Sequence, residues 1–328
     1  MKYSKYIITL LLCSGLLFVS TCGGGGETLR HYPVKKKSNY GNKKISRFRD
    51  LVAPCPSLVL EAWKKWDNRS DYRVYTPTEK EKDLIEVDLL KLPPLTRRVL
   101  KKKLLGIFFI SNVIGSGITD WVLDSRGNIY CYMIFNPIVL KKNMSELITW
   151  KEQTCYRDNS GDETVEISVT TRERGFFYIA LHESTHVVDY VQQITPFTEE
   201  GVKKFYPRVP ASTPFTKGTW CSLKKTCRTF PFRKKVRFYG LGGPPMAERR
   251  DARKLYDALM GSPFFSLYGS MNWAEDLAEF LTFYHLTQKM GLTYRISVKK
   301  GGKEVYSCEP AANPLVKKRF KTMEVFYR

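Results

Sequence analysis

The chain has 328 residues, 43% of them hydrophobic, and a formal net charge of +22 at pH 7. A chain of this length and composition can bury a large core, which excludes a wholly disordered or fibrous protein. The positive charge is spread over several segments, and no nucleic-acid-binding motif accompanies it, so we expect no nucleic-acid partner.

The N-terminus has the pattern of an export signal. A short basic start is followed by an apolar run from Tyr6 to Val19, which is shorter than the about 20 residues of a membrane span. Cys22 and a run of glycines come next, and this order resembles a bacterial lipoprotein signal. The resemblance implies a signal over residues 1–21, a lipid anchor on Cys22 and an extracytoplasmic place on the bacterial envelope; an ordinary cleaved signal is the alternative.

Residues 22–50 are polar and basic, with glycine and asparagine among the lysines. This composition predicts a flexible tether. The tether could also approach an anionic membrane surface, which attracts each such charge by about 1 kcal/mol. A solvated linker and a membrane-associated segment both remain open.

Of the eight cysteines, six remain once Cys13 and Cys22 are set aside. An even number in an exported chain is typical of disulfides, of which six cysteines could form three. Cys221 and Cys227 are close enough in the sequence to close one loop, and we predict that pair alone. A zinc knuckle is the alternative, although the chain has no Cys-x-x-Cys.

Residues 51–105 are predicted to form a helical subdomain. Its helices are expected at 58–66, 79–92 and 96–105, and the pattern then changes to strand-like runs at 107–110, 118–123, 129–135 and 165–169. Short turns between these runs predict an α+β fold with one mostly antiparallel sheet in a second unit, residues 106–328. An edge of that sheet could accept an extended peptide as an added strand.

A largely apolar helix follows the last of these strands and contains the sequence His182-Glu183-Ser184-Thr185-His186, in a chain with only four histidines. Imidazoles four residues apart lie on one helix face and can hold one metal ion. Glu183 can then accept a proton from metal-bound water. A chance match on an amphipathic helix is the alternative. Asp189, one turn later, could brace His186 or be a surface acid.

Catalytic zinc usually takes three protein ligands, so one more is needed. Residues 272–288 predict a second helix, with Glu275 and Glu279 on one face among apolar residues. Glu275 would be the third ligand, and Glu279 would hold an imidazole N–H. Alternatively, Glu275 only caps the helix with Asn272, or His285 is the ligand. Glu275 and His285 lie about 15 Å apart along a helix, so only one of them can reach the metal.

The two motifs together resemble those of the gluzincin zinc metallopeptidases. The pattern Tyr268-Gly-x-x-Asn-x-x-Glu275-x-x-Ala-Glu279 is similar to that of the anthrax lethal factor catalytic domain family. The resemblance implies a zincin-like fold, with a mixed, mostly antiparallel sheet packed on the active-site helix and a second helical lobe. It also implies one Zn²⁺ bound by His182, His186 and Glu275, with Glu183 as general base and Tyr268 as oxyanion stabiliser.

The stretch between the two motifs is long, with 88 residues separating His186 from Glu275. We place an insertion at about 195–245, which is basic and aromatic and includes a possible hinge at 240–243. It could form a flap over the cleft or a surface insertion.

The sequence as a whole predicts an exported zinc endopeptidase that acts on an extracytoplasmic protein or peptide. The alternative is a non-catalytic surface lipoprotein that binds host or envelope polymers and whose metal site is degenerate or structural. Glu183 favours the enzyme, because a structural metal site needs no base at that position.

Overall fold

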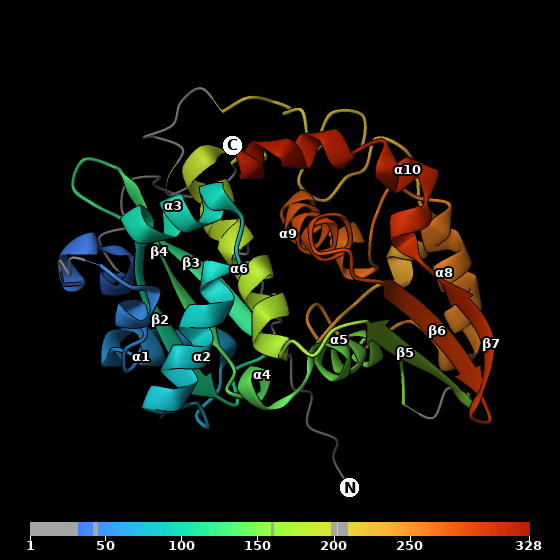
Figure 1. Cartoon of the computed structure of the whole chain (residues 1–328), viewed down its shortest axis with the longest axis horizontal. Helices are drawn as coiled ribbons and strands as arrows, with labels where there is room; N and C mark the ends of the chain where they lie inside the picture. The colour runs from blue at the N-terminus through green and yellow to red at the C-terminus, as the bar shows by residue number, and fades with distance from the viewer. Residues whose placement is uncertain (1–31, 42–44, 159–160, 198–201, 203–208) are drawn as a thin grey trace, which may run out of the picture.

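The computed structural model describes residues 32–41, 45–158, 161–197, 202 and 209–328 (Figure 1). Helices and two separate, mostly antiparallel sheets make up the fold. The predicted α+β class is therefore confirmed. Among these residues, no helix combines the length and apolar character that crossing a bilayer requires.

The three helices predicted near the start of the fold are present. They are α1 (Ser57–Asp67), α2 (Glu79–Leu90) and α3 (Pro94–Lys103). Thr78 caps α2 by accepting the N–H of Glu81, and Pro94 opens α3 at a position where no N–H is needed. The short strand β1 (Arg73–Tyr75) was not predicted; it pairs with the first strand of the following sheet.

The first sheet has the strand order β1-β2-β4-β3. Its longer strands are β2 (Leu104–Ser111), β3 (Gly117–Leu123) and β4 (Ile129–Phe135). The β2–β4 pair is parallel and the other two pairs are antiparallel. Strands β2 and β4 are almost continuously apolar because both faces of the sheet are covered. Strand β3 is an edge strand, and it contacts the histidine-bearing helix.

Part of the predicted tether is packed against this sheet, which corrects the expectation for residues 32–41 and 45–50. These residues form short 3₁₀ turns, η1 (Pro33–Lys35), η2 (Lys37–Asn39) and η3 (Phe48–Leu51). Val34 and Phe48 are buried, and Lys35 is ion-paired with the buried Asp120 of β3. Apolar residues spaced through a basic segment thus anchor it. The predicted signal and Cys22 lie outside the described residues.

The prediction of a single sheet is wrong, because the fourth predicted strand belongs to a second sheet of order β5-β6-β7. Its strands are β5 (Glu163–Val169), β6 (Tyr294–Lys300) and β7 (Lys303–Cys308), and all pairs are antiparallel. β5 has the predicted alternation, with Val165, Ile167 and Val169 buried. Its partner β6 comes from the far end of the chain, and such long-range pairing leaves no local signal.

The other helices that the structure describes follow the first sheet in the chain. They are α4 (Ile138–Lys141), α5 (Met144–Gln153), α6 (Gly175–Gln192), α8 (Ala252–Met260), α9 (Trp273–Tyr284) and α10 (Pro314–Lys317). Short turns complete the C-terminal half: η4 (Pro231–Lys235), η5 (Arg249–Asp251), η6 (Tyr268–Ser270), the π-helical η7 (His285–Lys289), η8 (Pro310–Ala312) and η9 (Phe320–Tyr327). Helix α6 packs on β3, β4 and α9, so it joins the first sheet to the second half of the molecule (Figure 1).

Candidate metal centre

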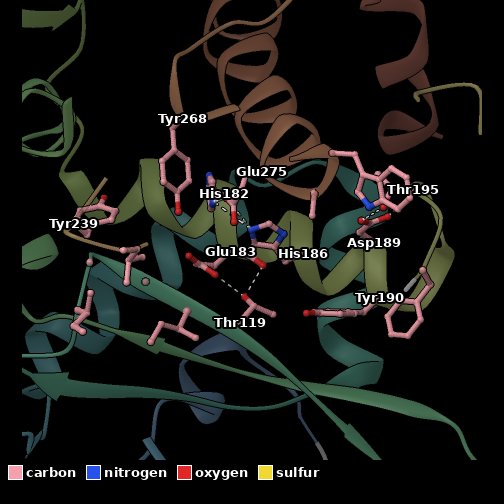
Figure 2. Close-up of a pocket in the computed structure, with 18 of the residues that line it drawn as sticks. Thr119, His182, Glu183, His186, Asp189, Tyr190, Thr195, Tyr239, Tyr268 and Glu275 are labelled. Atoms are coloured by element: carbon pink, nitrogen blue, oxygen red, sulfur yellow. Dashed lines mark hydrogen bonds and ion pairs between the residues drawn. The ribbon is translucent and has the colours of Figure 1, made fainter. Parts of the chain in front are cut away.

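Helices α6 and α9 bring the three predicted ligands together. His182 Nε2 lies 3.2 Å from His186 Nε2 and 3.1 Å from Glu275 Oε2, and His186 Nε2 lies 3.7 Å from the same Glu275 oxygen (Figure 2). Glu275 and His182 are each 4% exposed, whereas His186 is only partly covered. Among the described residues, this is the one group of three or more potential ligands whose atoms lie close enough for a metal ion.

The spacing of the three atoms fits a tetrahedral zinc site. Zinc binds imidazole nitrogen and carboxylate oxygen at about 2.0–2.2 Å, so neighbouring ligand atoms should be about 3.3 Å apart. The three separations of 3.1, 3.2 and 3.7 Å bracket that value. Both imidazoles contribute Nε2, so the same type of nitrogen points to the shared centre. The donor set and its spacing therefore fit a single zinc ion.

The capping role considered for Glu275 belongs to Asn272. The side-chain oxygen of Asn272 accepts the N–H groups of Ala274 and Glu275, at 3.0 and 3.1 Å. The Glu275 carboxylate turns instead to the histidines. Burial opposes its ionisation, but hydrogen bonds to His182 and His186 lower its pKa to about 2. Glu275 thus offers an ionised oxygen to the centre.

Glu279, one turn further along α9, lies behind His182 as predicted. Its Oε1 is 3.0 Å from His182 Nδ1, which fixes the tautomer that leaves Nε2 facing the other ligands. Burial lowers the pKa of His182, but the hydrogen bonds to Glu275 and Glu279 outweigh it and raise that pKa to about 10. The surroundings of His182 therefore favour a positive charge, whether a proton or a metal ion.

Three further residues that the sequence did not indicate hold Glu279. Lys151 of α5 and Ser266 donate to Oε2, at 2.7 and 2.6 Å, and Tyr178 donates to Oε1, at 2.6 Å. The Lys151 ammonium also lies 4.8 Å from the centre of the Tyr268 ring. Burial alone would raise the pKa of Glu279, but the Lys151 charge and His182 hold it well below its usual range. A lysine that is 3% exposed thus links the metal centre to Tyr268.

Glu183 lies beside the three ligands without belonging to them. Its Oε2 accepts a hydrogen bond of 2.8 Å from Thr119 on the edge strand β3, and the same hydroxyl also bonds the Glu183 backbone oxygen. Burial raises the pKa of Glu183, although His182, His186 and Thr119 act in the opposite direction. Gly117 faces this carboxylate so closely that an added Cβ would lie 2.8 Å from Glu183 Cγ. The edge strand therefore fixes the position of the candidate base.

The ligands and Glu183 line one pocket, together with Tyr268 and the start of β3. Figure 2 shows the Tyr268 side chain beside His182, with its hydroxyl pointing into the pocket; the two ring centres are 5.8 Å apart. Burial raises the Tyr268 pKa well above its usual value, so the phenol keeps its proton and can act as a donor. Its position suits the predicted oxyanion role.

The predicted insertion contributes to the pocket wall. Tyr239 and Leu241 line the pocket, and Phe238 packs edge-on against Tyr268, with ring centres 5.0 Å apart. Tyr239 was not predicted as a site residue; its only sequence signal was an aromatic position beside glycines. Part of the predicted insertion, residues 238–241, thus contacts the site.

The predicted disulfide between Cys221 and Cys227 is confirmed. The loop that it closes is joined to α9, since the Leu223 carbonyl accepts the N–H of Trp273, the first residue of that helix. No other cysteine pair is bonded in the part of the chain that the structure describes. The unpaired cysteines are Cys55, Cys131, Cys155 and Cys308.

Two residues considered for the site have other partners. Asp189 is 9% exposed, and both its oxygens accept hydrogen bonds from Thr195, so it fastens the chain that leaves α6. His285 lies outside the pocket and its Nδ1 is 2.7 Å from the Tyr327 hydroxyl, with the two rings stacked. Asp189 is therefore not a surface acid, and His285 does not share the metal centre.

Comparison with known proteins found no relative of this chain. No protein-family model, no curated protein and no solved structure matches the chain. The class of the site therefore rests on its own chemistry, which is that of a candidate metal centre with an acid–base group beside it.

Proposed function

We propose that this protein is a zinc-dependent endopeptidase with a zincin-like fold of the gluzincin type. The observation that carries the proposal is the position of Glu183, buried in the pocket wall next to three residues spaced as zinc ligands. A purely structural zinc site closes all four positions with protein ligands and has no use for a base beside it. Three ligands that line an open pocket leave a position for water and substrate.

His182, His186 and Glu275 would hold the zinc ion, which when bound supplies a Lewis acid that makes water a stronger nucleophile and polarises a carbonyl. Glu183 accepts the proton of the attacking water and passes it to the nitrogen of the leaving amine. Tyr268 donates a hydrogen bond to the oxygen on which negative charge develops. Thr119 keeps the Glu183 carboxylate pointed into the pocket.

The edge strand β3 supports a peptide as substrate. Gly117 and Thr119 line the pocket, and β3 has a partner strand on one side only. An extended peptide that pairs with this edge would pass along the metal centre with its backbone in register. At the other end of β3, Leu123 is paired with Lys36, so the peptide would have only the Gly117 end of the strand to pair with.

The N-terminal pattern supports an extracytoplasmic substrate. The basic start, the short apolar run and Cys22 are typical of a lipoprotein signal. The proposal is thus a membrane-anchored metallopeptidase that cleaves a protein outside the cytoplasm of a bacterium.

The first experiment measures the metal content of the purified protein beside two variants, Glu275→Ala and His285→Ala. We expect about one zinc per chain in the wild type, its loss in Glu275→Ala and its retention in His285→Ala. Zinc that is absent from the wild type, or that is indifferent to Glu275→Ala, would overturn the ligand assignment and leave the non-catalytic surface lipoprotein as the better account.

The second experiment tests catalysis with a peptide-library digest. Glu183→Gln should keep its zinc and lose about 10²- to 10⁴-fold in activity, the usual contribution of general acid–base catalysis. A wild-type protein that binds zinc but cleaves no peptide in the library would contradict the peptidase proposal, as would a Glu183→Gln variant of unchanged activity.

A further inference from the structure

A second concavity lies on the first sheet, apart from the metal centre, and lysines surround it. The residues that line it include Lys37 of η2, Lys101 and Lys102 near the end of α3, and Tyr130 of β4. None of these residues lines the pocket of the metal centre. We call this group, with Lys103, the lysine pocket.

Two lysines of the pocket converge on one tyrosine ring. Lys37 and Lys103 both lie over the Tyr130 ring, with ammonium nitrogens 5.4 and 4.6 Å from its centre. Lys101, Lys102 and Lys103 form no ion pair with any carboxylate among the described residues. Several lysines elsewhere do form such pairs, for example Lys91 with Glu173 and Lys299 with Glu166.

The pocket has one acid, Asp124, which offsets no more than one of the lysine charges. The Asp124 carboxylate accepts hydrogen bonds from the backbone N–H groups of Arg126 and Asn128 and from the Asn128 side chain, at 2.8 to 2.9 Å. It is therefore engaged in shaping the turn between β3 and β4. Like charges gathered around one concavity repel each other, and an anion placed among them removes that repulsion.

The position of the pocket along the chain indicates the source of the anion. Lys37 lies five residues after Tyr32, the first described residue, so the upstream chain joins the fold close to this pocket. That upstream chain contains the apolar run at 6–19 and Cys22. The ten steps from Cys22 to Tyr32 span at most about 35 Å when fully extended. A lipid on Cys22 would therefore hold the lysine pocket within reach of the bilayer surface.

We propose that the lysine pocket is a docking surface for the phosphate headgroups of an anionic membrane, and that it orients the folded domain on the bilayer. The tyrosine ring and the lysine stems supply an apolar floor, and the ammonium groups face the phosphates. Docking at this surface is independent of the peptidase chemistry, because it uses no residue of the metal centre.

Vesicle flotation tests the proposal on the chain without the predicted signal, residues 22–328 with Cys22→Ser, so that neither the apolar run nor a lipid anchor masks the contribution of the lysines. Vesicles of phosphatidylglycerol mixed with phosphatidylcholine should bind the protein, and vesicles of phosphatidylcholine alone should not. Lys101→Gln with Lys102→Gln should weaken binding by about 30-fold, since each lysine near an anionic surface contributes about five-fold. Lys101→Arg with Lys102→Arg keeps both charges and should bind as the parent does.

The matched control is Lys317→Gln with Lys318→Gln, which removes two exposed charges at α10, far from α3 in Figure 1. It should retain most of the binding. An equal loss in this control would show that net charge alone drives association and would overturn the proposal. Two other results would also overturn the proposal. The first is displacement of the protein from the vesicles by inorganic phosphate at modest concentration. The second is that the protein binds a duplex oligonucleotide through Lys101 and Lys102, while its binding to vesicles does not depend on these lysines.

Discussion

Two clusters of buried charge lie on opposite faces of strand β3, and they are built differently. On one face, Lys35 is paired with Asp120, which also accepts hydrogen bonds from the Tyr132 hydroxyl and the Trp121 N–H. The Lys35 ammonium lies 4.2 Å from the centre of the Trp121 ring. Every charge of this cluster is thus satisfied within the protein, and the cluster is closed to solvent.

On the other face, the candidate metal centre directs two imidazole nitrogens and a carboxylate oxygen at one point of a pocket. Its supporting groups, Glu279 and Lys151, are satisfied in the same way as Lys35 and Asp120. The three candidate ligand atoms instead have one another as neighbours, 3.1 to 3.7 Å apart, at the wall of a pocket. Burial of charge therefore does not distinguish a candidate ligand-binding site from a structural ion pair. The distinguishing feature is that several potential metal-ligand atoms converge at a pocket.

The largest effect is expected from Lys35→Met, which leaves Asp120 buried without its cation. Removing one partner of a buried pair costs about 3–5 kcal/mol in the free energy of unfolding. Urea unfolding should show this loss, while the zinc affinity of the folded protein stays as in the wild type. The exposed neighbour Lys36 provides the control, since Lys36→Met should change stability by less than about 0.5 kcal/mol. A Lys35→Met variant as stable as the wild type would mean that the closed cluster contributes nothing.

The next effect concerns His285, the histidine of the second motif that lies outside the metal centre. Burial lowers its pKa to about 4, so the folded protein keeps it neutral while the unfolded chain, with a pKa near 6.5, becomes protonated. Its contribution to stability is complete above about pH 6.5 and is lost as the pH falls toward 4, by up to about 3 kcal/mol. Between pH 4 and 6.5, the free energy of unfolding should depend less on pH in His285→Gln than in the wild type. The same pH dependence of the unfolding free energy in both proteins would contradict a lowered pKa for His285.

A smaller effect is expected at the metal centre from Lys151→Met. The variant leaves Glu279 without its ion pair, and the carboxylate then holds the His182 ring less firmly. Losing such a supporting group typically weakens metal binding by 10- to 100-fold, and competition with a zinc chelator measures this directly. Lys151→Arg keeps the charge and should recover part of the affinity. Unchanged affinity in Lys151→Met would show that Tyr178 and Ser266 suffice to hold Glu279.

The smallest effect is expected from Thr119→Val, which removes the hydroxyl that bonds Glu183. One such hydrogen bond contributes about 1 kcal/mol, so the unfolding free energy should fall by that amount. The zinc content should not change, because Thr119 touches none of the three ligands. Thr119→Ser retains the hydroxyl and should behave as the wild type. A loss of zinc in Thr119→Val would place the threonine within the ligand set.

The sequence predicted those parts of the fold that depend on local patterns. Helical periodicity located α1, α2 and α3, and the spacing of His182, His186 and Glu275 identified residues that the structure brings together. Partners distant in the chain were not predicted. Lys151 resembles any surface lysine of a short helix until α9 places Glu279 against it, and β5 shows no local preference for β6 over β3.

The error at the N-terminal segment has the same origin. The lysines and glycines of residues 22–50 are typical of a linker, and that composition outweighed the few apolar residues among them. Val34 and Phe48 are buried in the core, and Lys35 pairs with a carboxylate on a strand 85 positions later. A lysine becomes a core residue only through such a partner, which a local pattern cannot reveal.

The disulfide loop bears on the order in which the molecule is completed. In the loop closed by Cys221 and Cys227, the Leu223 carbonyl accepts the N–H of Trp273. Trp273 is the first residue of α9 and lies two residues before Glu275. Thiols are oxidised outside the cytoplasm and kept reduced within it. In a newly made chain, His182 and His186 would therefore already lie on α6 before the Cys221–Cys227 disulfide, which precedes Glu275, has formed. For the exported zinc enzyme proposed above, the covalent staple next to the third ligand would then form only after export.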